Sequence, residues 1–270
     1  MLLKLIKYDF KYLFKMLIPL YVVCLGLALI NGFLLIPSQY NSSLLADEDL
    51  VAEFFYMMLD LFVNLSACMI FSINLFAIIW GVKRFFTNVF GKEGYLTNTL
   101  PVTHHEVILS KLISITIAII ASFVAFCFII SLFYMGIYDI TVADIVEVKD
   151  YLVDVPLSFT ISLYLCGVVV LMSTVLQIFA SISIGHLTKN RILCSYIAYF
   201  VLANVIVQPI TTLFTLDYVK SVEETIIYMR KLNLGVFTPL LWGYIVSFAV
   251  LGLIFYFITQ KIIKNKLNLQ

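Results

Sequence analysis

The sequence predicts an all-α polytopic membrane protein with six transmembrane helices. Six apolar stretches contain no Asp, Glu, Lys or Arg, and each has the length of about 20 residues that a helix needs to cross about 30 Å of hydrocarbon. Charged residues make up only 12% of the chain, about half of the 25% that is usual in soluble domains. Both observations exclude a soluble globular domain. The stretches run over 16–36, 61–82, 112–135, 157–184, 192–216 and 236–260.

The charges between these stretches predict the orientation of the chain. Both ends of the chain and the segments 83–111 and 185–191 carry 13 of the 17 Lys and Arg residues, whereas the other segments carry 13 of the 16 acids. Because Lys and Arg near helix ends are retained on the cytoplasmic side, we expect both termini to be cytoplasmic. This placement requires an even number of crossings, and six satisfies it. The predicted location is the cytoplasmic (plasma) membrane, with a multi-pass topology.

Residues 1–15 are expected to form a separate amphipathic helix before the transmembrane domain, which covers 16–260. On a helical wheel, one narrow arc holds four lysines: Lys4, Lys7, Lys11 and Lys15. Such a helix is predicted to lie in the membrane plane, where each lysine gains about 1 kcal/mol from anionic lipid headgroups. The alternative is a basic flank that only orients the first crossing. A basic cytoplasmic tail, 261–270, follows the last crossing.

Three segments are expected to face outward as loops. Two of them, 37–60 and 136–156, are acidic, and either a solvated loop or a vestibule for cationic cargo fits this charge. The third, 217–235, has apolar residues at helical spacing between charged ones and is predicted to contain a short amphipathic helix.

Polar side chains inside the apolar stretches are candidates for a substrate path. They are costly in lipid and should face protein or a cavity, and we select Gln177, Asn204 and Gln208. Hydrogen bonding between helices is the alternative role. Pro209 cannot donate a backbone hydrogen bond, so it is expected to disturb the fifth helix. The stretches contain no titratable acid or base, which disfavours a proton-coupled mechanism.

Motifs for catalysis or cofactor binding are not expected in this chain. His105-Glu106 matches the first two residues of the zinc-binding motif His-Glu-x-x-His, but the second histidine of that motif would fall at position 109, which is Leu109. Gly91-Lys92 lacks the upstream glycine and the following Ser or Thr of a phosphate-binding loop. We therefore predict no enzyme activity, no metal and no bound cofactor, and we find no nucleic-acid signal.

The long cytoplasmic segment 83–111 is the most informative part of the sequence. Gly91 and Gly94 permit a turn in it. A short helix is expected after the turn, with several side chains on one of its sides. These are Tyr95, Leu96, Thr99 and Leu100.

This short helix is expected to end at Pro101, which stops a helix. Thr103 and Glu106 have the spacing of a capping box, which predicts the start of the next helix. A short rigid helix held between two crossings is a suitable contact for a cytoplasmic partner. The alternative is a loop that only reverses the chain.

The segment 91–111, with Glu-Gly-Tyr-Leu, Leu-Pro-Val-Thr and Ser-Lys-Leu, resembles the permease subunits of type-2 ATP-binding-cassette exporters, particularly their Gram-positive bacterial branch. Six crossings, a basic amino terminus, the short cytoplasmic segment 185–191 and the helix expected in the last outer loop add to this resemblance. The motif covers about twenty residues.

The resemblance implies a coupling helix that docks onto a separate ATPase subunit, which binds ATP and Mg²⁺. The implied contacts are Glu93, Tyr95, Leu96, Thr99 and Leu100. A second contact is expected over 186–191, with Lys189 and Arg191 as its cations. The expected assembly contains a second permease copy or a paralogue, and membrane lipid surrounds it. The cargo implied by this branch is a peptide or a lipid-like compound, with a role in peptide-antibiotic resistance.

Two other functions remain open at the level of the sequence. An ATP-independent secondary carrier or channel would transport without a partner, and changes in the segment 83–111 would then have little effect. A scaffold or sensor subunit that transports nothing would tolerate leucine at the polar positions within the spans.

Overall fold

The computed structural model describes residues 2–31, 50–91, 94, 102–135, 156–212 and 237–266, and this part of the chain is helical, with no strand in it. Six of its helical segments are long and apolar enough to cross a membrane. The predictions of an all-α fold and of six spans are therefore confirmed. The elements are α1 (Leu2–Leu29), α3 (Leu50–Val89), α5 (His104–Met135), α7 (Leu157–Gly185), α8 (Arg191–Val201), the π-helix η3 (Leu202–Val207) and α10 (Thr238–Lys266).

Several helices extend beyond the apolar stretches that predicted them. α1 passes Lys15 without a break, so the expected in-plane helix and the first span form one helix. α3 begins at Leu50, so the second part of the expected loop 37–60 is helical. The backbone hydrogen bonds of a helix do not depend on the surrounding hydrocarbon, so a helix continues until a turn signal ends it.

Both ends of the segment 83–111 are likewise helical, since α3 continues to Val89 and α5 already begins at His104. α10 likewise continues into the predicted tail and ends at Lys266. The helix predicted within 217–235 lies outside the described residues.

The fifth span is disturbed next to its proline, as predicted. α8 gives way to the π-helix η3, which ends two residues before Pro209. The backbone N–H of Gln208 donates to the carbonyl of Ala203, five residues earlier. Proline has no N–H with which to continue the regular ladder, and π-turns commonly accommodate such interruptions.

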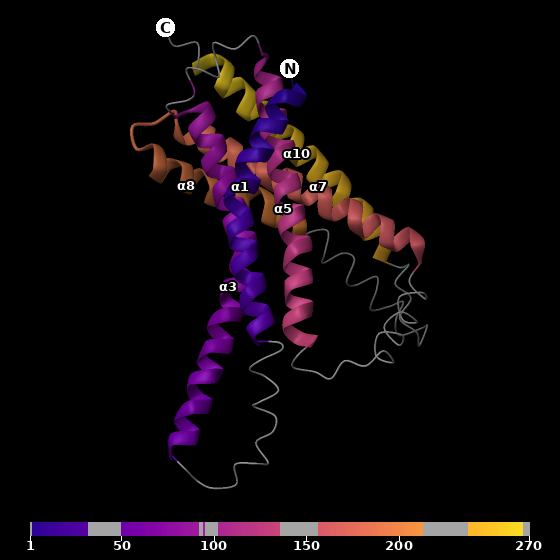
Figure 1. Ribbon diagram of the computed structural model, residues 1–270. Coiled ribbons are helices and arrows are strands. Elements are labelled where there is room, and N and C mark those ends of the chain that lie inside the picture. Colours follow the sequence, from indigo (N-terminus) through magenta and orange to yellow (C-terminus); the bar gives the residue numbers. More distant parts are fainter. Residues whose placement is uncertain are drawn as a thin grey trace.

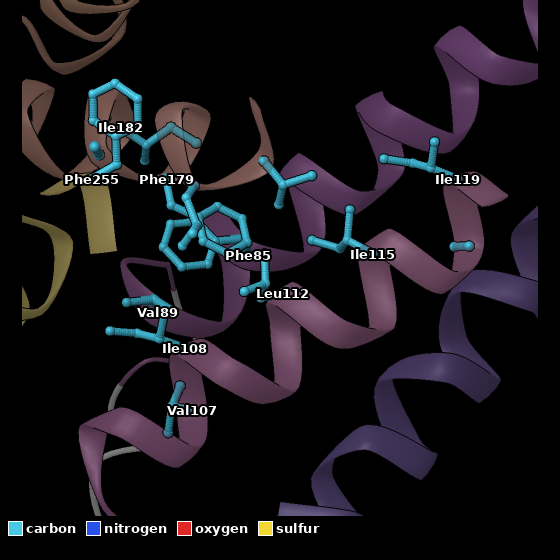
Figure 2. Close-up of a cluster of buried hydrophobic side chains, with 14 of the residues drawn as sticks. Phe85, Val89, Val107, Ile108, Leu112, Ile115, Ile119, Phe179, Ile182 and Phe255 are labelled. Atoms are coloured by element: carbon cyan, nitrogen blue, oxygen red, sulfur yellow. The ribbon is translucent and has the colours of Figure 1, made fainter. Parts of the chain in front are cut away.

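The helices form two groups that share one hydrophobic core. α1 packs along α5 and α3, and α10 packs along α7 (Figure 1). Phe85 of α3 and Phe179 of α7 join the groups, because their rings stack with centroids 3.8 Å apart and neither ring is exposed (Figure 2). We call this cluster the shared core. Its members include Leu13, Leu17, Phe85, Val89, Ile108, Leu112, Ile115, Phe179, Ala180, Leu251 and Phe255.

A second apolar cluster contains residues of α1, α3 and α5 alone. Its buried members are Cys24, Ala28, Ile70, Ile73, Ile129 and Phe133. At this level α7 and α10 lean away from the first group (Figure 1). The two groups are therefore joined mainly in the half of the bundle that contains the shared core.

Large apolar side chains cover much of the outer surface. Val22, Leu75, Phe128 and Phe257 are examples, each more than half exposed. Soluble monomers rarely expose apolar patches of this extent. Together with the six long apolar helices, this surface identifies a multi-pass membrane protein.

Candidate functional site at the basic end of the bundle

One end of the bundle holds Lys189 and Arg191, together with the ends of α3 and α5 between which the other expected partner contacts lie in the sequence. We call it the basic end: α1, α5 and α8 begin there, and α3, α7 and α10 end there. Figure 1 shows the start of α1 and the end of α10 at this end. His105 near the start of α5 contacts Tyr256 of α10, with its Nδ1 2.6 Å from the tyrosine hydroxyl. The basic end is thus fixed by contacts between helices far apart in sequence.

A buried ion cluster ties three helices together at the basic end. Asp9 of α1 is only 2% exposed and accepts hydrogen bonds on the same carboxylate oxygen from Arg84 of α3 and Lys111 of α5. The Arg84 Nε lies 3.1 Å from this oxygen, and its guanidinium lies over the ring of Tyr12, 4.4 Å from the ring centroid. Buried charges need such partners, because their removal from water is otherwise uncompensated.

The sequence pattern does not predict this cluster. Asp9 is expected on an in-plane surface helix, whereas it lies buried in the long helix α1. Asp9, Arg84 and Lys111 lie outside the six charge-free stretches, in the basic-end parts of helices that qualify as spans. A usable signal was present: Asp9, Leu13 and Leu17 recur at intervals of four residues, and this face is the buried one.

The four lysines that predicted a membrane-surface helix are exposed, as expected. They are Lys4, Lys7, Lys11 and Lys15. Their contact with lipid headgroups stays a prediction.

The predicted glycine turn follows the end of α3. The Gly94 N–H donates to the Gly91 carbonyl at 3.0 Å. A Cβ atom at Gly91 would lie 2.7 Å from the Thr87 carbonyl oxygen, and one at Gly94 would lie 2.7 Å from the Val89 carbonyl oxygen. The turn therefore requires a residue without a side chain at both positions.

The predicted capping box begins α5. The Thr103 N–H donates to the Glu106 carboxylate at 3.0 Å, and the Glu106 N–H donates to the Thr103 hydroxyl oxygen at 3.3 Å. This reciprocal pair satisfies two backbone donors that a helix start leaves free. α5 consequently has a well-defined beginning on this side of the loop.

The residues expected to contact an ATPase lie between these two anchors. Glu93, Tyr95, Leu96, Thr99 and Leu100 are outside the described residues. Their roles stay predictions, and the structure defines only the segments to which they are attached.

The turn after α7 lies against the end of α3. The ring of Phe90 stacks on His186 with centroids 4.1 Å apart and planes 20° apart, and Phe86 lies 5.3 Å from the same ring. His186 is the C-cap of α7, and its Nδ1 lies 3.1 Å from the Ile182 carbonyl oxygen. Lys189 is exposed in the same turn. The end of α3 and the turn after α7 are therefore in contact, although no sequence pattern predicts that they meet.

The environment of His186 favours its neutral form. Burial lowers the pKa of His186, and the nearby Arg191 lowers it further, while the hydrogen bond to Ile182 acts in the opposite direction. With Nδ1–H donating to that carbonyl, Nε2 is left as an acceptor. The Nε2 atom is buried and has no hydrogen-bond partner among the described residues. A proton on Nε2 would therefore be poorly accommodated.

The three residues selected for a substrate path differ in their exposure. Gln177 is buried in α7, whereas Asn204 and Gln208 are exposed on the fifth span. The Asn204 Nδ2 donates to the Phe200 carbonyl at 2.9 Å. This bond lies within one helix, and the role of Asn204 in a substrate path stays a prediction.

Comparisons of the chain with protein-family models, with curated proteins and with solved structures find no match. Within the described part of the chain, no group of three or more His, Cys, Asp or Glu side chains is placed to hold a metal ion. The interpretation of the basic end therefore depends on its geometry and charge.

Proposed function

We propose that this chain is the permease subunit of an ATP-driven exporter in the cytoplasmic membrane, with both termini cytoplasmic. A separate ATPase subunit, which binds ATP and Mg²⁺, would dock at the basic end on the segment 90–103, which connects α3 to α5, and on the segment 186–191. The single observation that carries this proposal is the stacking of Phe90 on His186. Because of this contact, a partner that displaces either segment also acts on the other.

The anchors of the first segment support a mechanical role. The Gly91–Gly94 turn fixes its start to α3, and the Thr103–Glu106 capping box fixes its end to α5. A displacement of the segment is thereby passed to two spanning helices. A loop with flexible ends would absorb the same displacement.

The position of the shared core supports a change between two arrangements of the helix groups. Phe85 and Phe179 join the groups near the basic end, while the second apolar cluster lies within α1, α3 and α5 alone. A movement at the basic end can therefore alter the separation of the groups at the other end. ATP-driven closure of the partner would bias this equilibrium between inward-open and outward-open states.

The charges of the basic end would guide the partner. Lys189 and Arg191 are exposed, and Glu93 would provide the opposite charge on the first segment. Complementary charges across an interface set its register and accelerate association. The chain would supply the path, and the ATPase would supply the energy.

A second permease copy or a paralogue completes the proposed assembly. Only 6% of the most apolar part of the fifth span is buried, and Asn204 and Gln208 lie exposed on it. Polar side chains that face lipid are unfavourable. A second permease against this span would shield them and place them beside the path of the cargo, which we propose to be a peptide or a lipid-like compound.

The proposal is tested by isolating the tagged chain from its native membranes in mild detergent and identifying copurifying proteins by mass spectrometry. We expect an ATPase subunit in near-equal amount, lost in the Glu93→Ala/Leu96→Ala variant while membrane insertion is retained. The Lys261→Ala/Lys264→Ala variant, which alters exposed cations of α10, is the matched control. Isolation without an ATPase, combined with transport in proteoliposomes without ATP, would favour a secondary carrier. Isolation without an ATPase and without transport would favour a scaffold or sensor.

A further inference from the structure

A cavity of about 470 Å³, open to the surface along one side, lies between α3, α7 and α8 near the basic end. Small-molecule sites commonly measure about 300–1,000 Å³ and are mostly apolar with a few polar groups. The cavity is lined by Ile79, Val82, Lys83, Phe86, Ile178, Ser181, Ile182, Arg191, Ile192, Ser195, Tyr196 and Tyr199.

Two cations lie in the lining of this cavity. Lys83 directly follows an apolar stretch of α3, and Arg191 is the first residue of α8. Both are exposed, no carboxylate is among the lining residues, and neither side chain forms an ion pair with another described residue. The charge of this site is therefore complementary to an anion.

The remaining lining is mostly apolar, with Ser181 and Ser195 as its aliphatic hydroxyl groups, and it extends along the helices away from these cations. Ile79 lies one helical turn from Lys83, and Tyr196 and Tyr199 lie one to two turns from Arg191. A neighbouring cavity of about 280 Å³ shares Val82, Ile178 and Tyr199 with the first and continues the apolar lining toward α5. Cations beside an apolar groove form a site for an amphiphile. Tyrosine is typical of the level at which hydrocarbon meets headgroups.

We propose that this cavity binds an anionic lipid, with its phosphate between Lys83 and Arg191 and an acyl chain along Ile79 and Ile178. The lipid would contact Phe86, whose ring centroid lies 5.3 Å from that of His186. It would therefore lie beside the contact between the two segments of the basic end. This site does not depend on an ATPase partner and exists whether or not the chain belongs to an exporter.

The test is native mass spectrometry of the full-length, delipidated protein with dioleoyl phosphatidylglycerol or dioleoyl phosphatidylcholine. We expect the first bound lipid to show a clear preference for phosphatidylglycerol. Since a basic residue contributes about 1 kcal/mol toward anionic lipid, the Lys83→Gln/Arg191→Gln variant should lower this preference by roughly fivefold per cation and roughly 25-fold in total. The Lys261→Gln/Lys264→Gln variant removes two exposed cations of α10, outside the cavity lining, and should leave the preference unchanged.

A second variant tests the apolar part of the site without changing its charge. Ile79→Trp should fill the groove and lower phosphatidylglycerol binding severalfold, while inorganic phosphate at millimolar concentration should not displace the lipid. An equal loss of the preference for phosphatidylglycerol in the Lys83→Gln/Arg191→Gln and Lys261→Gln/Lys264→Gln variants would overturn the proposal, since it would indicate nonspecific surface binding. Displacement by inorganic phosphate together with an inert Ile79→Trp variant would also overturn it, because the ligand would then be a free anion.

Discussion

Phe90, the first residue after α3, stacks on His186, the residue that ends α7, with ring centroids 4.1 Å apart. This contact brings together two segments that are widely separated in the sequence. An aromatic pair of this kind contributes about 0.5–1.5 kcal/mol beyond the area that it buries. It is therefore strong enough to hold the two segments in one arrangement and weak enough to change under the action of a partner.

The contact is predicted to weaken in acid because of His186. Its pKa in the fold lies below the unfolded value of about 6.5, so the fold favours the neutral ring. The contribution of His186 to stability is therefore fully present above about pH 6.5 and is lost as the pH falls below that value. Hydrogen exchange of residues 182–190, corrected for intrinsic rates, should be faster at pH 5.5 than at pH 7.5. The His186→Gln variant should show no such difference, and an equal difference in this variant would assign the effect to another group.

Removal of the Asp9 carboxylate should destabilise the bundle. The Asp9→Asn variant removes the carboxylate that Lys111, only 3% exposed, contacts in this buried cluster. Breaking a buried ion pair from one side typically costs about 3–5 kcal/mol. A lower unfolding temperature in detergent is expected, measured by intrinsic fluorescence. Lys11→Gln on the exposed face of the same helix should be close to neutral, and equal unfolding temperatures for the two variants would contradict the role of the cluster.

The turn between α7 and α8 should not tolerate a side chain at Gly185. A Cβ atom there would lie 2.6 Å from the Ser195 backbone nitrogen and 2.7 Å from the Arg191 carbonyl oxygen. The Gly185→Ala variant must shift backbone and should lose about 1–3 kcal/mol of stability. Gly167→Ala on the same helix has no atom within 4 Å of the new carbon and should gain up to about 1 kcal/mol from helix propensity. Thermal unfolding of both variants checks this, and a stable Gly185→Ala variant would show that the turn adapts.

The start of α5 should fray when its capping box is broken. Thr103→Ala removes the side-chain acceptor of the Glu106 N–H and should cost about 1 kcal/mol. Thr103→Ser keeps a hydroxyl and should behave as the wild type does. Hydrogen exchange of residues 104–108 distinguishes the two variants, and equal protection would mean that packing of α5 alone fixes its first turn.

Features that depend on neighbouring residues were predictable from the sequence. The apolar stretches predicted the six spans, because a helix needs one continuous apolar stretch of sufficient length to cross a bilayer. The Gly91–Gly94 turn and the Thr103–Glu106 capping box were also predicted, since each depends on residues three apart.

Contacts between distant segments were not predictable in this way. Periodicity shows that Asp9 shares a face with Leu13 and Leu17, but it does not specify which helix packs on that face. The pairing of Asp9 with Arg84 and Lys111, and that of Phe90 with His186, depend on the order in which the helices pack. The helix bounds also differed from the apolar stretches, because capping and turn residues end these helices.

The most direct test of the proposed partner site is photo-crosslinking in intact cells. A photoreactive amino acid is placed singly at Tyr95, at Lys189 or at Leu157, which begins α7 at the opposite end of the bundle and is 74% exposed. The account predicts crosslinks from positions 95 and 189 to the same ATPase subunit and none from position 157. Crosslinks to an ATPase from position 157, or from none of the three positions, would contradict it.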